Sequence, residues 1–84
     1  MHQDFQDRVV VVSGAATGVG LAVSRRFSEA GAVVWMVDID VDRGEAESSE
    51  IDRAVFHRCD VTDESEVEGL WGHIAEASPV VDVL

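Results

Sequence analysis

Three glycines follow an apolar run near the start of the chain, and their spacing suits the binding of a phosphate group. Residues 9–12 are four consecutive valines, and Gly14, Gly18 and Gly20 come soon after them. Glycine lets the backbone turn sharply and approach a bulky group without a Cβ in the way. A helix that begins here presents unpaired N–H groups and the positive end of its dipole at the same point. The pattern predicts a loop that holds the pyrophosphate of a dinucleotide.

A carboxylate, Asp38, closes the next apolar run, residues 32–37. At the end of a strand it is placed to accept hydrogen bonds from the hydroxyls of an adenosine ribose, and it would repel a 2′-phosphate. The nearest base, Arg43, lies in the segment beyond, so nothing in the loop compensates that repulsion. The sequence therefore predicts NAD as the cofactor. Asp38 as plain surface charge is the alternative, and we interpret Asp40 and Asp42 as surface charge.

Asp60 and Val61 follow a third predicted strand, residues 54–59. Ligands of open α/β sheets gather at the carboxyl ends of the strands, so contact with an adenine ring is one interpretation. A plain turn into the next helix is the other. His57 and Cys59 lie within the same predicted strand and are interpreted as core residues. A metal site needs three or four converging ligands, and His2 and His73 do not have that spacing, so none is predicted.

The elements that position these residues alternate along the chain. Strands are predicted at 9–12, 32–37, 54–59 and 80–84, and the unbroken valines at 9–12 are typical of a parallel strand buried on both faces. Apolar residues at three- and four-residue steps predict a helix after the first strand and another after the third. Residues 41–50, which include Gly44, form a weaker helix candidate. The order βαβαβαβ predicts an α/β fold, a Rossmann-type doubly wound parallel sheet with strand order 3-2-1-4 and a ligand crevice between the first and fourth strands.

The sequence also predicts the apolar faces of two of these helices and the N-terminal cap of one. In the helix after the glycines, the expected apolar stripe is Val19, Ala22, Val23, Phe27 and Ala30. In the helix after the third strand, Thr62 is the expected N-terminal cap. The expected apolar face of that helix consists of Val67, Leu70, Trp71, Ile74 and Ala75.

Size and charge exclude several classes of protein. A chain of 84 residues forms one small domain at most, and 46% hydrophobic content favours a packed core over disorder. The net charge of −11 argues against a nucleic-acid partner. No signal peptide is visible at the N-terminus, and no apolar run is long enough to span a membrane. A single cysteine suits a reducing compartment, so we expect a cytoplasmic protein.

The segment Ser13-Gly14-Ala15-Ala16-Thr17-Gly18-Val19-Gly20 resembles the Thr-Gly-x-x-x-Gly-x-Gly loop of the short-chain dehydrogenase/reductase family. Asp38, then Cys59-Asp60-Val61-Thr62-Asp63, then Val81-Asp82-Val83-Leu84 match that family in order and spacing. The resemblance covers essentially the whole chain. Ser13 replaces the usual threonine and keeps its hydroxyl group.

This resemblance implies an oxidoreductase that transfers hydride between NAD and an alcohol or carbonyl substrate. It implies that the glycines shape the loop, that Val19 faces the nicotinamide, that Asp38 holds the ribose and that Asp60 and Val61 touch the adenine. The expected cofactor-binding residues are Ser13, Gly14, Thr17, Gly18, Val19, Gly20, Asp38, Ile39, Asp60 and Val61. The complete enzyme is expected to be a homo-oligomer that acts on a small molecule.

The chain has no tyrosine and no lysine, whereas the family it resembles uses a serine, a tyrosine and a lysine for catalysis. The Asn-Asn-Ala-Gly segment of that family would begin directly after Leu84. We therefore interpret residues 1–84 as a partial NAD(P)-binding Rossmann domain that stops before the catalytic half, and we assign no catalytic residue. The alternatives are a stand-alone NAD-binding module without catalysis and a non-functional gene fragment.

Overall fold

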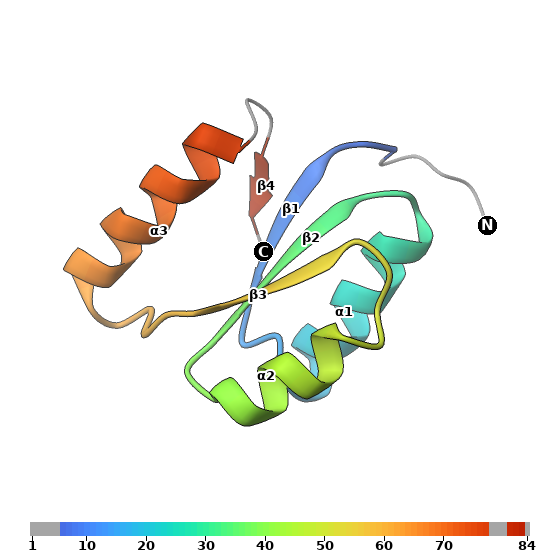
Figure 1. Ribbon diagram of the computed structural model, residues 1–84, viewed down its shortest axis with the longest axis horizontal. Coiled ribbons are helices and arrows are strands. Elements are labelled where there is room, and N and C mark those ends of the chain that lie inside the picture. The colour runs from blue at the N-terminus through green and yellow to red at the C-terminus, as the bar shows by residue number, and fades with distance from the viewer. Residues whose placement is uncertain (1–5, 78–80, 84) are drawn as a thin grey trace.

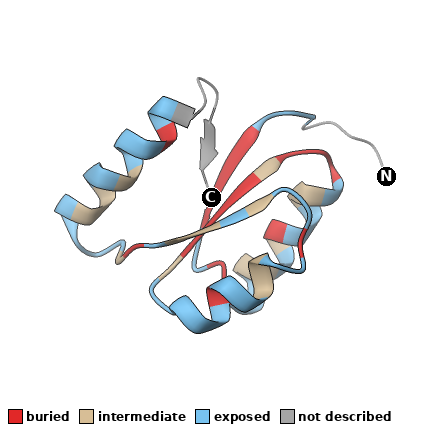
Figure 2. Cartoon of the chain, in the orientation of Figure 1, coloured by how far each residue is buried: buried red, intermediate tan, exposed pale blue. Residues whose placement is uncertain are grey.

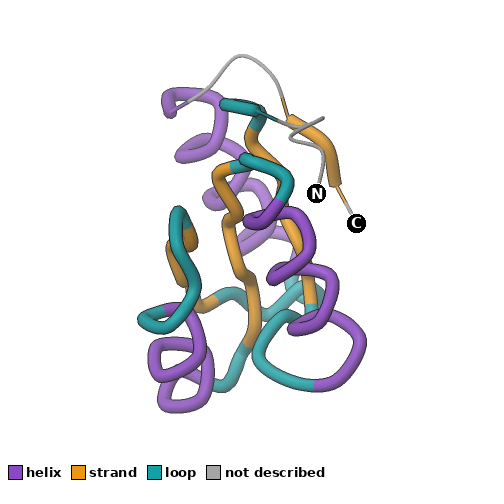
Figure 3. Tube along the Cα trace, turned by 90° about the vertical axis from the view of Figure 1, so that its right-hand side faces the viewer, coloured by secondary structure: helices purple, strands orange, loops and turns teal. Residues whose placement is uncertain are grey.

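The computed structural model describes residues 6–77 and 81–83, in which four strands alternate with three helices (Figure 1). The strands run side by side through the middle of the molecule, with the helices packed around them (Figure 3). This alternation confirms the predicted βαβαβαβ order. The elements are β1 (Val9–Ser13), α1 (Gly18–Glu29), β2 (Val33–Asp38), α2 (Val41–Ser48), β3 (Ala54–Arg58), α3 (Glu64–Ala77) and β4 (Val81–Val83).

All four strands are parallel and pair in the order β3-β2-β1-β4, as predicted. Val9 of β1 is in register with Val33 of β2 on one side and with Val81 of β4 on the other. Since the strands are parallel, their carboxyl ends meet at one edge of the sheet, where Ser13 and Asp38 lie. The predicted crevice between β1 and β4 involves the chain around residue 84, which lies outside the described residues.

The valine run of β1 is buried because alternate side chains pack on opposite faces of the sheet (Figure 2). On one face, partly buried side chains of α1 pack against the strands, and on the other face side chains of α3 do so. Both sides of β1 and β2 are therefore shielded from water, which explains their unbroken apolar sequence. The first core cluster is Val10, Val12, Ala15, Ala32, Val34, Met36 and Ile51, and the second is Val9, Val11, Trp35, Val37, Cys59 and Ile74.

The inward face of α1 matches the expected stripe in part, since Val23 and Phe27 pack against the first core cluster and Ala30 is buried. Val19 is 81% exposed and Ala22 is also exposed, whereas Leu21 packs against the first core cluster. Ser24 is fully buried, which its hydroxyl tolerates because it donates to the carbonyl oxygen of Gly20 at 2.8 Å. The packed side of the helix therefore keeps the expected Val23, Phe27 and Ala30 but is extended by Leu21 and Ser24, and Val19 is left at the surface near the glycine loop.

The first turn and the apolar face of α3 also differ from the prediction. Asp63, not Thr62, caps the helix, because its Oδ1 accepts from the backbone N–H groups of Ser65 (3.0 Å) and Glu66 (3.3 Å). Trp71 is 43% exposed, so its expected place in the core is wrong, and Ala75 is exposed as well. The packed face of this helix consists of Val67, Leu70 and Ile74.

Gly44 made residues 41–50 a weaker helix candidate in the sequence, and in the structure it has a packing role. It is buried in the middle of the helix, and a Cβ added to it would lie 2.0 Å from Cε1 of Phe56. Phe56 belongs to β3 and packs against the first core cluster. The absence of a side chain at position 44 lets α2 lie directly on this ring.

We expect Gly44→Ala to lower the melting temperature of the protein. Alanine favours a helix over glycine by about 1 kcal/mol, but overpacking a core contact costs roughly 1–3 kcal/mol. Gly69→Ala on α3 is the matched control, because nothing lies within 4 Å of the added Cβ. Thermal unfolding should show the control unchanged or more stable. A gain in stability for both variants would contradict the packing role of Gly44.

Candidate functional site at the carboxyl edge of the sheet

The loop between β1 and α1 turns at two glycines with left-handed backbone. Gly14 has φ +63° and Gly18 has φ +59°, a region that side-chain-bearing residues seldom adopt. The loop is fastened to the end of β2 by two hydrogen bonds. The N–H of Ala15 donates to the carbonyl oxygen of Val37 (3.1 Å), and that of Ala16 donates to Oδ2 of Asp38 (3.0 Å).

The N-terminus of α1 follows this loop, and no side chain of the helix's own first turn balances the positive end of its dipole. Thr17 at the cap position makes no side-chain hydrogen bond to the helix, and the first turn contains no acidic residue. In a chain of net charge −11, this leaves a helix of 12 residues with its positive end unmatched. Such an end favours an anionic ligand.

Gly20, in the first turn of α1, is the point of closest approach between helix and loop. A Cβ added here would lie 2.1 Å from the carbonyl oxygen of Gly14 and 2.7 Å from its carbonyl carbon. The clash is with backbone, which cannot move without reshaping the loop. Thus Gly14 and Gly18 supply the turns, and Gly20 lets the helix start close against the loop.

Asp38 at the end of β2 accepts hydrogen bonds from the glycine loop and from the turn that follows β2. Besides accepting from Ala16, its carboxylate accepts from the N–H of Asp40 through Oδ1 (3.0 Å). Burial acts to raise the pKa of Asp38, but the backbone hydrogen bonds from Asp40, Ala16 and Ile39 lower it below its ordinary value overall. The group is therefore an anion at neutral pH, ready to accept further hydrogen bonds.

Asp60 begins the loop after β3 and is tied within that loop. Its Oδ1 accepts from the N–H (3.0 Å) and the hydroxyl (2.6 Å) of Thr62. These bonds lower the pKa of Asp60, the hydroxyl bond having the larger effect. Val61, the next residue, is 54% exposed at the tip of the loop.

The three loops meet at a small pocket of about 160 Å³. Five of the predicted cofactor-binding residues line it, namely Gly14, Asp38, Ile39, Asp60 and Val61. The other five are in or beside the glycine loop and do not line this pocket: Ser13, Thr17, Gly18, Val19 and Gly20. The structure thus brings together residues from the ends of β1, β2 and β3, which are far apart in the sequence.

Two residues of the pocket wall, Val37 and Cys59, were not predicted as site residues. Cys59 is 4% exposed, and burial together with the negative charge of Glu66 raises the pKa of its thiol. It therefore lines the pocket as a small uncharged group. The sequence could have indicated this role of Cys59, because the residue directly precedes Asp60 in a predicted strand that ends at the carboxyl edge of the sheet.

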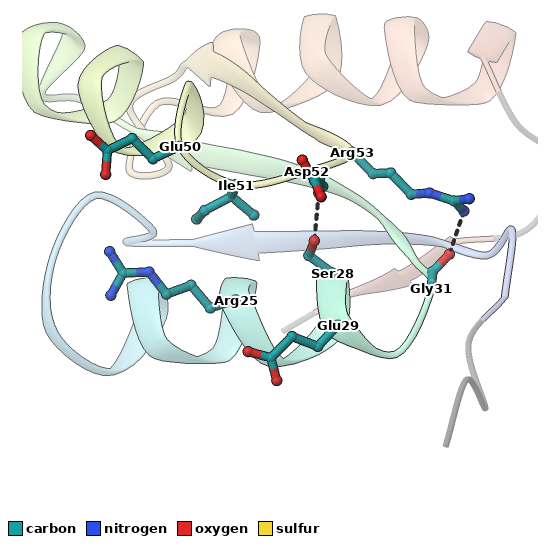
Figure 4. Close-up of a pocket in the computed structure, with 8 residues that line it drawn as sticks. All are labelled: Arg25, Ser28, Glu29, Gly31, Glu50, Ile51, Asp52 and Arg53. Atoms are coloured by element: carbon teal, nitrogen blue, oxygen red, sulfur yellow. Dashed lines mark hydrogen bonds between the residues drawn. The ribbon is translucent and has the colours of Figure 1, made fainter. Parts of the chain in front are cut away.

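A larger cavity of about 470 Å³ lies near the amino ends of β2 and β3 (Figure 4). It contains none of the predicted site residues, and local contacts engage three of its polar side chains. Ser28 donates to the carbonyl oxygen of Asp52, and Arg53 donates to that of Gly31 at 3.0 Å. Arg25 forms an ion pair with Glu47 at 3.0 Å. Since ligands of open α/β sheets bind at the carboxyl edge, we take the smaller pocket as the candidate site.

His57 of β3 is a packing residue. Its ring stacks on that of Trp35, with centroids 4.2 Å apart and planes 8° from parallel. Burial lowers the pKa of His57, and the neighbouring His73 lowers it further. Within residues 6–77 and 81–83, no three His, Cys, Asp or Glu side chains come together as a metal site would require. No helix in this part of the chain is long and apolar enough to cross a bilayer.

Comparisons with known proteins agree with this architecture. A family model described as short chain dehydrogenase matches residues 8–84. The chain is 38% identical over 84 residues to "Short-chain dehydrogenase reductase 5" of Arabidopsis thaliana, covering 98% of this chain and 32% of that protein. It spans about a third of the length of such curated relatives.

Two solved structures have the same fold. The structure of a short chain dehydrogenase from Mycobacterium smegmatis superimposes with a TM-score of 0.87 at 28% identity, covering 98% of this chain and 37% of that one. A short-chain dehydrogenase/reductase from Burkholderia phymatum in complex with NAD gives 0.82 at 23% identity, over 88% and 28% of the respective chains.

Proposed function

Because the chain belongs to the short-chain dehydrogenase family, we propose that residues 1–84 form the dinucleotide-binding part of an NAD-dependent oxidoreductase. The complete enzyme would transfer hydride between NAD and an alcohol or carbonyl compound. Bound NAD supplies the redox chemistry of such a reaction. The residues of this chain bind and orient it.

One observation carries the proposal: at the carboxyl edge of the sheet, a pocket lined by Gly14 of the glycine loop and the anionic Asp38 adjoins the loop that leads to the uncapped N-terminus of α1. The helix N-terminus and the loop suit a pyrophosphate, which is anionic. The carboxylate of Asp38 suits the paired hydroxyls of a ribose. Asp60 and Val61 line the same pocket and suit the adenine ring.

We assign two further predicted residues to parts of NAD. Val19, exposed beyond the loop, is assigned to the nicotinamide side, and Ile39 to the adenosine side next to Asp38. A solved relative carries NAD in its crystal structure, which supports the choice of cofactor. The full set is Ser13, Gly14, Thr17, Gly18, Val19, Gly20, Asp38, Ile39, Asp60 and Val61.

A second candidate function is a NAD-binding module without catalysis. The observation in its favour is that these 84 residues contain no tyrosine and no lysine. Tyrosine and lysine are side chains that commonly move protons in enzymes at neutral pH. With neither present, the chain lacks the tyrosine and lysine that the family uses for catalysis, and we propose that its residues only position a cofactor.

We expect the 84-residue chain to bind NAD and to turn over no alcohol or carbonyl substrate. Absorbance at 340 nm, followed with a panel of alcohols, should stay flat because the chain has no tyrosine or lysine to move the proton. Calorimetric titration and thermal melting should detect the binding of NAD. Turnover would show that this chain carries its own catalytic group, and absence of binding would overturn the proposed function.

We also propose that the protein acts in the cytoplasm and as a homo-oligomer. Its one cysteine, Cys59, is buried and unpaired, as suits a reducing compartment. Light scattering coupled to gel filtration measures the oligomeric state directly.

A further inference from the structure

We infer that Glu66 is a positioning residue for the adenine side of the pocket, because its carboxylate holds the loop that carries Asp60 and Val61. The inference rests on the proposed binding of NAD and extends it to α3. Glu66 does not line the pocket. It acts through the residues that do.

Glu66 joins the end of β3 and the start of the loop to the first turn of α3. Its Oε1 accepts from the guanidinium of Arg58, the last residue of β3, and from the backbone N–H of Asp60 at 3.1 Å. The Glu66 side chain is 32% exposed, so the contact is partly shielded from water. One oxygen atom thus fixes two points on either side of Cys59.

The other hydrogen bonds of Asp60 reach no further than the residue that caps α3. Its carboxylate binds Thr62, and its carbonyl oxygen accepts from the N–H of Asp63 at 3.0 Å. The bonds to Thr62 are internal to the loop, and the N–H of the neighbouring Cys59 donates to the carbonyl oxygen of Asp38 at 3.2 Å. The bond to Glu66 differs from these because it joins the backbone of Asp60 directly to a side chain of α3, a helix anchored in the core through Ile74, which is 1% exposed.

This tie decides where the carboxylate of Asp60 points. Both of its hydrogen bonds within the described chain go to Oδ1, which leaves Oδ2 for a ligand. A carboxylate oxygen accepts hydrogen bonds and suits the exocyclic amino group of adenine. A displaced loop would carry Oδ2 away from that amino group, while Gly14 and Asp38 across the pocket stay in place.

The test compares three variants by calorimetric titration with NAD. Glu66→Ala should raise the Kd for NAD roughly tenfold, equivalent to ~1.4 kcal/mol. Glu66→Gln should recover most of the affinity, because its amide oxygen can still accept from the N–H of Asp60. Glu64→Ala is the matched control and should leave the Kd unchanged. Glu64 is in the same helical turn and carries the same charge, and no hydrogen bond or ion pair joins its side chain to another described residue.

A second ligand separates positioning from simple loss of stability. Nicotinamide hypoxanthine dinucleotide has an oxygen in place of the amino group of adenine. Glu66→Ala should weaken its binding less than it weakens the binding of NAD. Equal losses of affinity for both ligands, or unchanged NAD binding in Glu66→Ala, would overturn the role of Glu66 but not the proposed function. Failure of the unmutated protein to bind NAD would overturn the proposed function, on which this inference rests.

Discussion

Replacing Gly20 with alanine is expected to weaken NAD binding by ~100-fold or more, the size of loss that a shift of about 1 Å in an active site can cause. The new Cβ would lie 2.1 Å from the carbonyl oxygen of Gly14, far inside van der Waals contact. The carbonyl belongs to the backbone of the proposed pyrophosphate loop and the Cβ is bonded directly to the backbone of α1, so a rotamer change cannot relieve the clash. Either the loop or the start of α1 must move.

Calorimetric titration of Gly20→Ala with NAD measures this loss, and thermal melting reports any accompanying loss of stability. Gly72→Ala is the matched control, because it also adds a methyl group to a helical glycine but meets nothing within 4 Å. The control should bind NAD as the unmutated protein does. Unchanged affinity in Gly20→Ala would show that the pyrophosphate does not bind at this loop.

Replacing Asp38 with alanine is expected to weaken NAD binding roughly ten- to a hundredfold, since hydrogen bonds to a charged group contribute about 1.5–3 kcal/mol. The same change removes the repulsion between the carboxylate and the 2′-phosphate of NADP. The preference for NAD over NADP should therefore fall. Fluorescence titration with both cofactors measures it, and equal affinities in the unmutated protein would refute the role of Asp38.

The contacts of Asp38 predict that this substitution has a second effect. The carboxylate also holds the glycine loop through the N–H of Ala16 at 3.0 Å. Asp38→Ala leaves that N–H without its partner, whereas Asp38→Asn removes the charge and keeps one acceptor oxygen. We expect Asp38→Asn to bind NADP more tightly than Asp38→Ala does. The reverse order would indicate that the hydrogen bond to Ala16 contributes nothing to binding.

Local patterns in the sequence were sufficient to predict the fold. A valine run buried on both faces, glycines at a strand-to-helix turn and apolar steps of three and four residues each depend on neighbours within a few positions. The element order and the strand order 3-2-1-4 followed from these patterns, and the structure confirms both. The carboxyl ends of parallel strands meet at one edge, so the place of Gly14, Asp38 and Asp60 could also be predicted.

Contacts between distant segments could not be predicted in this way. The packing of Gly44 on Phe56 depends on how closely α2 approaches β3, and the exposure of Trp71 depends on how far α3 rotates about its axis. The cap at Asp63 instead of Thr62 depends on which side chain reaches the free N–H groups.

The sequence by itself determined the order of the elements and the edge of the sheet at which the candidate site lies, because both follow from patterns repeated along the chain. Only the tertiary structure decided how that site is held. The bonds from Ala16 to Asp38 and from Asp60 to Glu66 join segments whose residue types have no distinctive spacing. A hydrogen bond depends on distances of a few tenths of an ångström, and these are set by the packing of the whole domain.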